Sequence, residues 1–403
     1  MEPPLYRPPP LLDQFISMYN RPMTLLTLVL ALGTVLFGSL DVSAQGRERE
    51  YTGMCDASAA ISLSDSLFAV ADDEVNVIRI YSLDSPGAPV AIAPLFPIES
   101  PDSSKEKKKK GKKKVKVPEG ATIPAPVIAG GEVSSPTTAE QILKATKRLP
   151  EIDLEAAARI DTMIFWVGSH GRNASGEEDL HRRQIFFSEI LAEKNPSSAL
   201  PLPSLKPILP PYTRLLDDLI AAPPLKRLRL EQAARLAPKE PGGFNIEAFG
   251  TTSDDRALIG LRNPLYNERA IVIPMKNPRA MIEGRSSTVL PPIYLDLSAR
   301  GIKDLVMIGS TAYIIAGAPD SSARGALFEW KDTTRSTEVR LMLDLASTGI
   351  NAEAILPLAG GRNLLLLSDD GKEIIEGKEC KKLKDSSKKK FRTVEISLPP
   401  HLQ

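Results

Sequence analysis

Acidic residues recur at or close to the start of a strand pair that occurs five times in the sequence. The acids are Asp56, Glu155, Glu247 and Glu353, and Lys303 replaces the acid in the fourth copy. If the copies surround one axis, these side chains form a ring in which the carboxylates raise one another's pKa values or bind a cation. Carboxylate and loop carbonyl oxygens are the ligands of Ca²⁺, so calcium is the first metal to consider. The alternative is that each acid caps a strand and holds a turn within its own copy.

Polar loops follow the second strand of four copies and supply a second group of candidate residues. The candidate ligand-binding residues are Asp72, Asp73, Arg172, Asn173, Arg262, Asn263, Asp369 and Asp370. Arg172 and Arg262 would bind a phosphate or carboxylate, and His170 would carry a proton beside them; these three are the candidate catalytic residues. Asp, Asn and Gly are also the residues that tight turns favour, so a purely structural role is the alternative.

Familiar catalytic motifs are absent from the sequence. It contains no G-x-S-x-G, H-E-x-x-H, Walker or C-x-x-C motif, which excludes the patterns of several common hydrolases, nucleotide-binding proteins and thiol oxidoreductases. Only three histidines are present, which argues against a histidine-rich zinc site. Motifs alone therefore leave open whether the protein is an enzyme.

The repeated unit that would position these residues consists of short β-strands. The copies begin at Asp56, Asp153, Asn245, Gly301 and Asn351, and each has an apolar strand, a polar turn and a second strand. A further β-rich segment follows each copy, and these segments lie at 75–83, 183–191, 270–275, 325–330 and 391–398. Three strands per copy, with a fourth that is easily missed, are typical of propeller blades. The sequence therefore predicts an all-β protein, a β-propeller of about five or six blades. A β-sandwich or two unrelated β domains are the alternatives.

Two insertions interrupt the repeat, and either could hide a sixth blade. Equivalent positions of successive copies are 97, 92, 56 and 50 residues apart, whereas propeller repeats have roughly 40–50 residues. We therefore expect a lysine-rich insertion at about 103–150 and a proline-rich, partly helical insertion at about 195–243.

The formal net charge of +1 hides an acidic body. Residues 1–44 carry −1 and residues 105–116 carry +8, so the rest of the chain carries −6. An acidic body argues against nucleic acid as a partner, and we expect the lysine-rich segment to be a solvated loop.

The N-terminal residues have the pattern of a secretory signal peptide. Residues 25–37 are apolar or small, Arg21 precedes them, and a cleavage site follows at Ala44. This apolar core is shorter than the roughly 20 residues that span a membrane. We therefore expect residues 1–44 to be cleaved and residues 45–403 to form the propeller domain of a secreted or periplasmic protein without a membrane span. An uncleaved anchor is the alternative. In an oxidising compartment Cys55 and Cys380 can form a disulfide, or they remain two buried thiols.

Several motifs, taken in order, resemble one bacterial family. CDASAA with FAVADDE, EIDLEAAARI with WVGSHGRN, NIEAF with LIGLRNPL, and NAEAILPL with LLLLSDDG are similar to the domain of unknown function 3616. The resemblance covers the chain from about Cys55 to the C-terminus, and it implies a fold without implying an activity. A looser similarity, limited to the acidic repeat starts and to Ser-Asp-Asp-Gly, is to the phytase-like esterase propellers of exported bacterial proteins.

These observations leave three functional hypotheses. The first is an exported β-propeller that binds a small-molecule or peptide ligand, with or without calcium, through an acidic axial face. The second is a metal-assisted phosphoesterase-like hydrolase, in which the acidic ring holds the metal and Arg172 and Arg262 hold the phosphate. The third is a purely structural interaction domain, in which neither the ring nor the loops bind a ligand.

Overall fold

The computed structural model describes residues 48–71, 73–96, 142–143, 146, 149–192, 203–322, 325–331, 333 and 336–399. The chain divides into two compact units, Met1–Leu40 and Asp41–Gln403, and all described residues belong to the second. The expected signal peptide, the lysine-rich segment at 105–116 and Asp72 lie outside the described residues. Within the described residues, no helix has the length and apolar character needed to cross a membrane.

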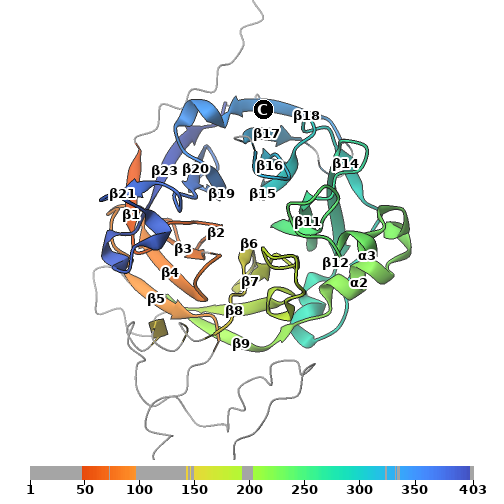
Figure 1. The fold of residues 1–403 in the computed structure, drawn as a ribbon, viewed down its shortest axis with the longest axis horizontal. Coiled ribbons are helices and arrows are strands. Elements are labelled where there is room, and N and C mark those ends of the chain that lie inside the picture. The colour runs from red at the N-terminus through yellow and green to blue at the C-terminus, as the bar shows by residue number, and fades with distance from the viewer. Residues whose placement is uncertain are drawn as a thin grey trace, which may run out of the picture. The chain divides into compact units, whose positions relative to one another are not determined.

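Five antiparallel sheets of four or five strands surround a common centre, and each sheet is one propeller blade (Figure 1). Blade 1 contains β2 (Ala59–Ser62), β3 (Leu67–Ala71), β4 (Val77–Ser82) and β5 (Ala91–Pro94). Blade 2 contains β6 (Leu154–Ile160), β7 (Met163–Gly168), β8 (Ile185–Leu191) and β9 (Ser204–Tyr212). Blade 3 contains β10 (Asn245–Thr251), β11 (Arg256–Asn263), β12 (Ala270–Lys276), β13 (Thr288–Val289) and β14 (Ile293–Leu295). Blade 4 contains β15 (Gly301–Ile308), β16 (Thr311–Gly317), β17 (Ala326–Trp330) and β18 (Val339–Asp344).

Blade 5 closes the ring by combining both ends of the described chain. It contains β19 (Ala352–Pro357), β20 (Asn363–Ser368) and β23 (Lys390–Ser397), and its outermost strand is β1 (Arg49–Thr52). A small hairpin of β21 (Ile374–Ile375) and β22 (Lys378–Glu379) lies between β20 and β23 in the chain. The predicted β-propeller is therefore confirmed, and the described residues form five blades without a sixth.

A disulfide reinforces this closure. Cys55, three residues after β1, is bonded to Cys380, which follows β22, and their Cα atoms are 5.9 Å apart. The expected pairing of the two cysteines is thus present in the structure. It links the N-terminal strand to the connection between the last two strands of blade 5.

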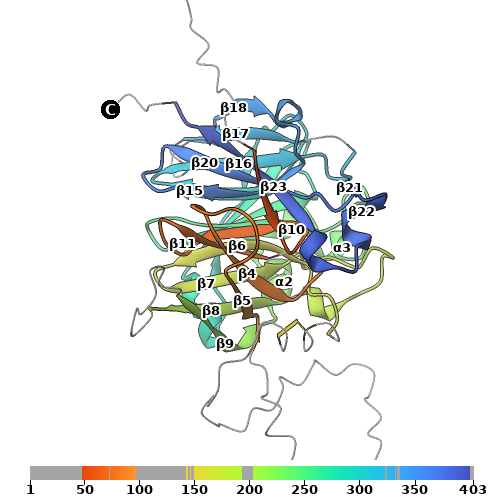
Figure 2. The ribbon, with the colours of Figure 1, turned by 90° about the vertical axis from the view of Figure 1, so that its left-hand side faces the viewer.

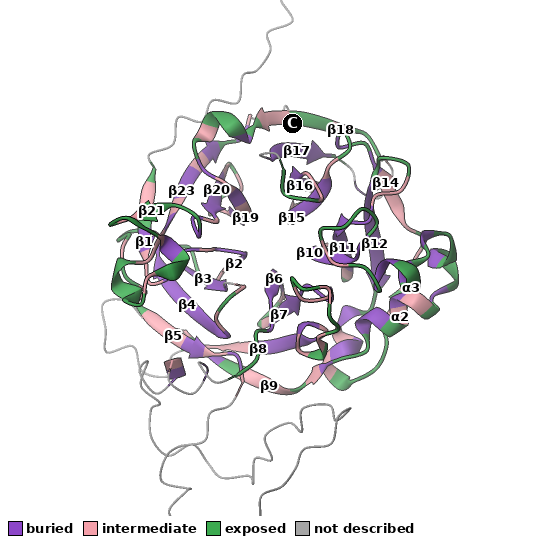
Figure 3. Cartoon of the chain, in the orientation of Figure 1, coloured by how far each residue is buried: buried purple, intermediate pink, exposed green. Residues whose placement is uncertain are grey.

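The hydrophobic core lies between neighbouring blades. Buried side chains form five clusters, and each cluster joins two adjacent sheets, such as Phe165 of blade 2 with Phe249 of blade 3. Figure 3 shows mainly buried residues on the inner strands and more exposed ones on outer strands such as β5, β9 and β18. Because both faces of an inner strand are covered, its sequence is apolar at successive positions instead of alternating.

The proline-rich insertion is partly a blade strand. Its first part forms β9, the outer strand of blade 2, and its second part contains α2 (Leu215–Ala221), η3 (Pro223–Leu228) and α3 (Leu230–Ala233). Helix α2 ends before Pro223 because proline cannot donate the backbone hydrogen bond that would continue it. The predicted partly helical segment is present, and its leucines pack on the core between blades 2 and 3.

Candidate functional site

The starts of the first strands and the ends of the second strands share one face of the ring. Antiparallel pairing produces this arrangement, because it places Asn245 opposite Asn263 and Gly301 opposite Gly317. Helix α3 and the β21–β22 hairpin both lie on this side of the ring (Figure 2). We call it the acidic face, and it comprises the residues that begin β2, β6, β10, β15 and β19 together with the loops that follow β3, β7, β11, β16 and β20.

A β-bulge marks the same position in four of the five inner strands. The strand register shifts at Glu155, Glu247, Lys303 and Glu353, which are the repeated charged residues of the sequence. A bulged residue leaves the hydrogen-bonded ladder, and the bulge turns its side chain away from the regular pleat. In blade 1, which has no bulge, Asp56 precedes the strand and pairs in a single bridge with Asp369. We call Asp56, Glu155, Glu247, Lys303 and Glu353 the axial ring.

The carboxylates of the axial ring lie within one electrostatic field. Burial raises the pKa of Glu155 well above its ordinary value, and the negative charges of Asp153 and Glu247 raise it further. The pKa of Asp56 is also raised well above the usual range, first by burial and then by Asp73 and Asp369. Because the interacting groups come from different blades, the repeated acids converge on the axis instead of acting only within their own repeats.

Two cations of the protein neutralise one side of the ring. The ammonium group of Lys303 forms an ion pair with Glu353 of the next blade, and Arg262 forms one with Glu247. All four side chains are largely buried, the most exposed being Glu353 with 20% of its side chain accessible. Each buried pair is therefore well compensated.

The side of the ring at blades 1 and 2 lacks such compensation. Among the described residues, Glu155 makes no hydrogen bond and no ion pair, although it is partly exposed. Asp56 accepts a hydrogen bond from Ser58 Oγ at 3.3 Å and otherwise faces the carboxylates of Asp73 and Asp369. The negative charge of the acidic face is therefore concentrated on this side.

Sequence reasoning missed the asparagines two residues before two of the acids. Asn245 Nδ2 donates to Glu247 Oε1 at 2.6 Å, and Asn351 Nδ2 donates to Glu353 Oε1 at 3.2 Å. The signal was present as a repeated Asn-x-Glu triplet at 245–247 and 351–353. These amides orient the carboxylates of the ring.

The ring is not a ready-made calcium centre. Within the described part of the chain, no three His, Cys, Asp or Glu side chains are grouped closely enough to hold a metal ion. Since Ca²⁺ takes about six to eight oxygen ligands, a calcium ion would require these carboxylates to move toward each other.

Both arginines proposed to hold a phosphate are engaged by the protein itself. Arg172 donates to the backbone oxygens of Ala234 and Gly176, at 3.1 and 3.0 Å. Arg262 pairs with Glu247 and also donates to Ala318 O at 2.9 Å and to Ser321 Oγ at 3.0 Å. The two guanidinium groups therefore stabilise loops and blades of the acidic face.

His170 is buried with only 1% of its surface accessible. Its Nδ1 lies 2.7 Å from Gly168 O, which makes Nδ1 the protonated nitrogen, and burial lowers its pKa to about 4. Neutral at physiological pH and enclosed, His170 is poorly placed to exchange protons with a ligand.

The remaining loop candidates mostly hold turns. Asn173 Oδ1 accepts from the backbone amides of Ser175 and Glu177, and Asn263 Nδ2 donates to Pro238 O at 2.9 Å. Asp370 forms a two-point ion pair with Arg392, at 2.9 and 2.7 Å. In contrast, Asp73 and Asp369 contribute charge to the axial ring, as the electrostatic effect on Asp56 shows.

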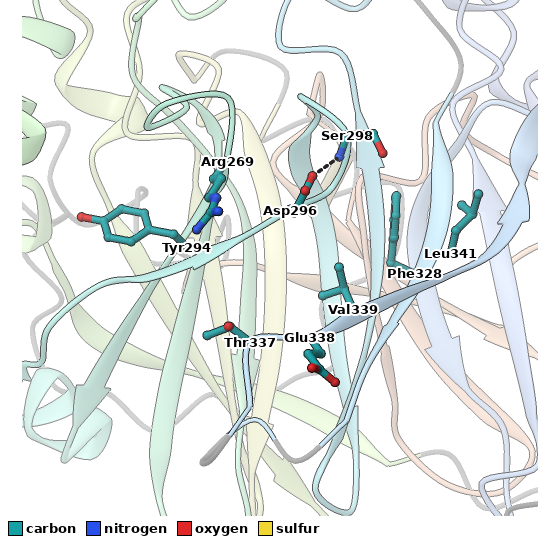
Figure 4. A pocket seen from close by; sticks show the side chains of 9 residues that line it. All are labelled: Arg269, Tyr294, Asp296, Ser298, Phe328, Thr337, Glu338, Val339 and Leu341. Atoms are coloured by element: carbon teal, nitrogen blue, oxygen red, sulfur yellow. Dashed lines mark hydrogen bonds between the residues drawn. The ribbon is translucent and has the colours of Figure 1, made fainter. Parts of the chain in front are cut away.

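Two cavities formed by described residues are lined without any residue of the axial ring. One of about 560 Å³ lies at the outer edge between blades 3 and 4 (Figure 4). Its lining is mixed: β17 and β18 of blade 4 supply apolar side chains, the segment before β18 supplies polar ones, and on the blade 3 side Asp296 accepts from the Ser298 amide at 3.1 Å. A smaller cavity of about 240 Å³ includes Asp370 and Arg392. No residue predicted from the sequence lines the larger cavity, whose full lining is Arg269, Tyr294, Asp296, Ser298, Phe328, Thr337, Glu338, Val339 and Leu341.

Comparison with protein families matches the middle of the chain. Residues 218–363 match the family described as "Protein of unknown function (DUF3616)". This match covers a little more than a third of the chain. The DUF3616 stretch runs from α2 to the first residue of β20, so it contains Glu247, Lys303 and Glu353 of the axial ring. The resemblance read from the motifs is thus confirmed, and the family description assigns no activity.

Comparison with solved structures finds distant similarities. The chain is similar to the β-propeller domain of Cps50 (Swd1) from Myceliophthora thermophila, with 8% identity, a TM-score of 0.33, and coverage of 85% of this chain and 96% of that one. It is also similar to virginiamycin B lyase from Staphylococcus aureus, with 10% identity, a TM-score of 0.35, and coverage of 88% of this chain and 99% of that one. No curated protein matches the chain.

Proposed function

We propose that this protein is a binding protein whose acidic face recognises a positively charged ligand at the propeller axis. One observation carries the proposal: the acids of different blades act on one another, and among the described residues Glu247 and Glu353 form ion pairs with Arg262 and Lys303, whereas Glu155 and Asp56 form none. A cation bound beside Glu155 and Asp56 would relieve the repulsion that raises their pKa values. The partial exposure of both side chains supports access from solvent.

An organic cation fits the ring better than a bare metal ion. The ring already contains an ammonium and a guanidinium group, each paired with a glutamate, whereas the described residues contain no compact set of metal ligands. Calcium remains part of the proposal as a competing cation, which the experiment below includes.

The hydrolase hypothesis requires two arginines that are free to bind a phosphate. Arg172 and Arg262 donate to protein oxygens, and His170 is enclosed. The geometry therefore supports a binding module over a phosphoesterase.

We also propose that the protein acts outside the cytoplasm. The apolar segment at 25–37 supports export, and the Cys55–Cys380 disulfide is the kind of bond that an oxidising compartment maintains.

Calorimetric titration tests the binding function. Ethylammonium, ethylguanidinium, calcium and sulfate would be titrated into the protein and into the double variant Asp56→Asn/Glu155→Gln. The matched control is Asp65→Asn/Asp84→Asn, which removes two exposed carboxylates from the turns that follow β2 and β4, at the opposite face of blade 1.

We expect at least one cation to bind, at least a tenfold loss of affinity in the ring variant, unchanged affinity in the control, and no sulfate binding. Absence of binding by every cation, or equal affinity in the two double variants, would overturn the proposal.

A further inference from the structure

In blade 5, the residues at the start of β19 bind the ammonium group of Lys303. Lys303 projects from the bulge of β15 and reaches the start of β19 in the next blade. There it donates to Ala352 O at 3.1 Å and to Asn351 Oδ1 at 3.4 Å, and it pairs with Glu353. The Asn351 amide is fully used, since its Nδ2 donates to Glu353 while its Oδ1 accepts from the ammonium.

The start of blade 3 repeats these acceptors. Asn245 Nδ2 donates to Glu247 Oε1, as Asn351 does to Glu353, so the amide lies against the axial ring. Its Oδ1 is buried and has no hydrogen-bond partner among the residues that the structure describes, and Asn245 exposes only 5% of its surface. A buried amide oxygen without a donor destabilises the folded state, because it has lost its hydrogen bonds to water. Asn245 Oδ1 in blade 3 is therefore an unused acceptor, whereas the equivalent atom in blade 5, Asn351 Oδ1, accepts a hydrogen bond from the Lys303 ammonium.

The preceding blade supplies no cation at this position. The bulge of β6 places Glu155 where the bulge of β15 places Lys303, and β6 packs beside β10 as β15 packs beside β19. Among the described residues, Glu155 has neither a hydrogen bond nor an ion pair, and the carboxylate of Glu247 helps to raise its pKa. Between blades 2 and 3 the chain thus presents a carboxylate and an amide oxygen that both lack a donor.

We propose that the interface between Glu155 of blade 2 and Asn245 of blade 3 binds a primary ammonium group of the ligand. This inference rests on the proposed cation-binding function and names the chemical class for that site. An ammonium has three donors and no acceptor, which matches the carboxylate of Glu155 and Oδ1 of Asn245. Lys303 is the internal precedent, because its ammonium occupies the equivalent acceptors of blade 5.

A lysine side chain or a small amine would supply this group. One source lies within the chain, because residues 105–116 contain nine lysines; the other source is an external molecule. The two sources share their chemistry, and a variant in which the nine lysines are replaced by serine distinguishes them.

Calorimetric titration with ethylammonium and with tetramethylammonium tests the proposal, because the second ion has the same charge without a donor. The proteins are the full chain, Glu155→Gln, Asn245→Leu and Glu155→Lys. The last variant copies blade 4 into blade 2, so its own lysine should occupy the acceptors, raise the melting temperature and abolish ethylammonium binding. Asp65→Asn/Asp84→Asn is again the control, because both carboxylates are exposed in turns at the opposite face of blade 1.

We expect ethylammonium to bind the full chain or, if the chain's own lysines compete, the serine-substituted chain. We further expect at least tenfold weaker binding of tetramethylammonium, at least tenfold loss in Glu155→Gln and Asn245→Leu, and little change in Asp65→Asn/Asp84→Asn. If Glu155→Lys fails to fold, the other two variants and the melting temperature with and without ethylammonium carry the test.

Two outcomes separate this inference from the proposed function. If cations bind but Glu155→Gln and Asn245→Leu bind ethylammonium as tightly as the parent, this site is wrong while the acidic face still binds cations. If no cation binds either chain, both proposals fail.

Discussion

The disulfide between Cys55 and Cys380 should contribute strongly to stability because it closes nearly the whole ring. The two cysteines are 325 residues apart, and the loop-entropy relation gives about 6 kcal/mol at 25 °C for a loop of this length. The contacts of β1 with β23 remain after the disulfide is removed. We therefore expect Cys55→Ala/Cys380→Ala to lower the free energy of unfolding by at least about 3 kcal/mol.

Guanidinium chloride unfolding of the double variant and of the parent measures this effect. The control is the parent protein unfolded in the presence of a reductant, which should approach the stability of the variant. A difference below about 1 kcal/mol between parent and variant would refute the closure argument, because the denatured chains would then differ too little in entropy.

The same variant should weaken cation binding. Residues on either side of Asp56 contact blade 5, since the Asp370 amide donates to Cys55 O at 2.8 Å and the Ala57 amide donates to Ser368 O at 3.1 Å. The disulfide fixes this segment, so its loss should allow Asp56 to leave the axial ring. Unchanged cation affinity in the variant would show that the backbone contacts alone position Asp56.

Three further predictions concern individual residues. Burial raises the pKa of Asp304 to about 7, so near neutral pH the folded state keeps a proton that the unfolded chain, in which the pKa has its ordinary value of 3.8, has lost. Stability should therefore fall as pH rises from about 4 to 7, and Asp304→Asn should remove about 4 kcal/mol of that fall in urea unfolding at the two pH values; equal slopes would contradict this. A Cβ at Gly301 would lie 1.8 Å from Arg262 O, so Gly301→Ala should destabilise the protein by about 3 kcal/mol, and an unchanged melting temperature would count against the described packing. Mass spectrometry of exported protein should find an N-terminus at Gln45 after cleavage behind Ala44, whereas an intact residue 1 would favour the anchor alternative.

The inner strands of the propeller were predictable because they lie between two sheets. Their sequences are short apolar runs ended by polar turns, and this pattern identified β6 with β7 and β10 with β11 without structural information. The outer strands were harder to predict. Strand β9 contains three prolines, which an edge strand tolerates because part of its backbone faces solvent. Ring closure by β1 depends on pairing with β23, from the opposite end of the chain.

The acids of the candidate site could be predicted from the sequence, but the hydrogen bonds and ion pairs of its residues could not. The recurrence of Glu155, Glu247 and Glu353 was visible in the sequence, but the bulges that turn them from the ladder depend on strand register. The sequence also could not show that Arg262 and Arg172 are engaged by nearby oxygens, because those partners belong to other turns and blades. Residue type alone therefore suggested an anion site that the geometry does not favour.

The central claim is that acids from separate blades share one electrostatic field at the axis. The most direct test is an NMR titration of carboxyl-labelled glutamates that measures the pKa of Glu155 in the parent protein and in Glu247→Gln. We expect Glu155 to titrate clearly above the ordinary range for glutamate, and its pKa to fall when the charge of Glu247 is removed. A pKa of Glu155 near the ordinary value of 4.5 that does not respond to Glu247→Gln would contradict the claim.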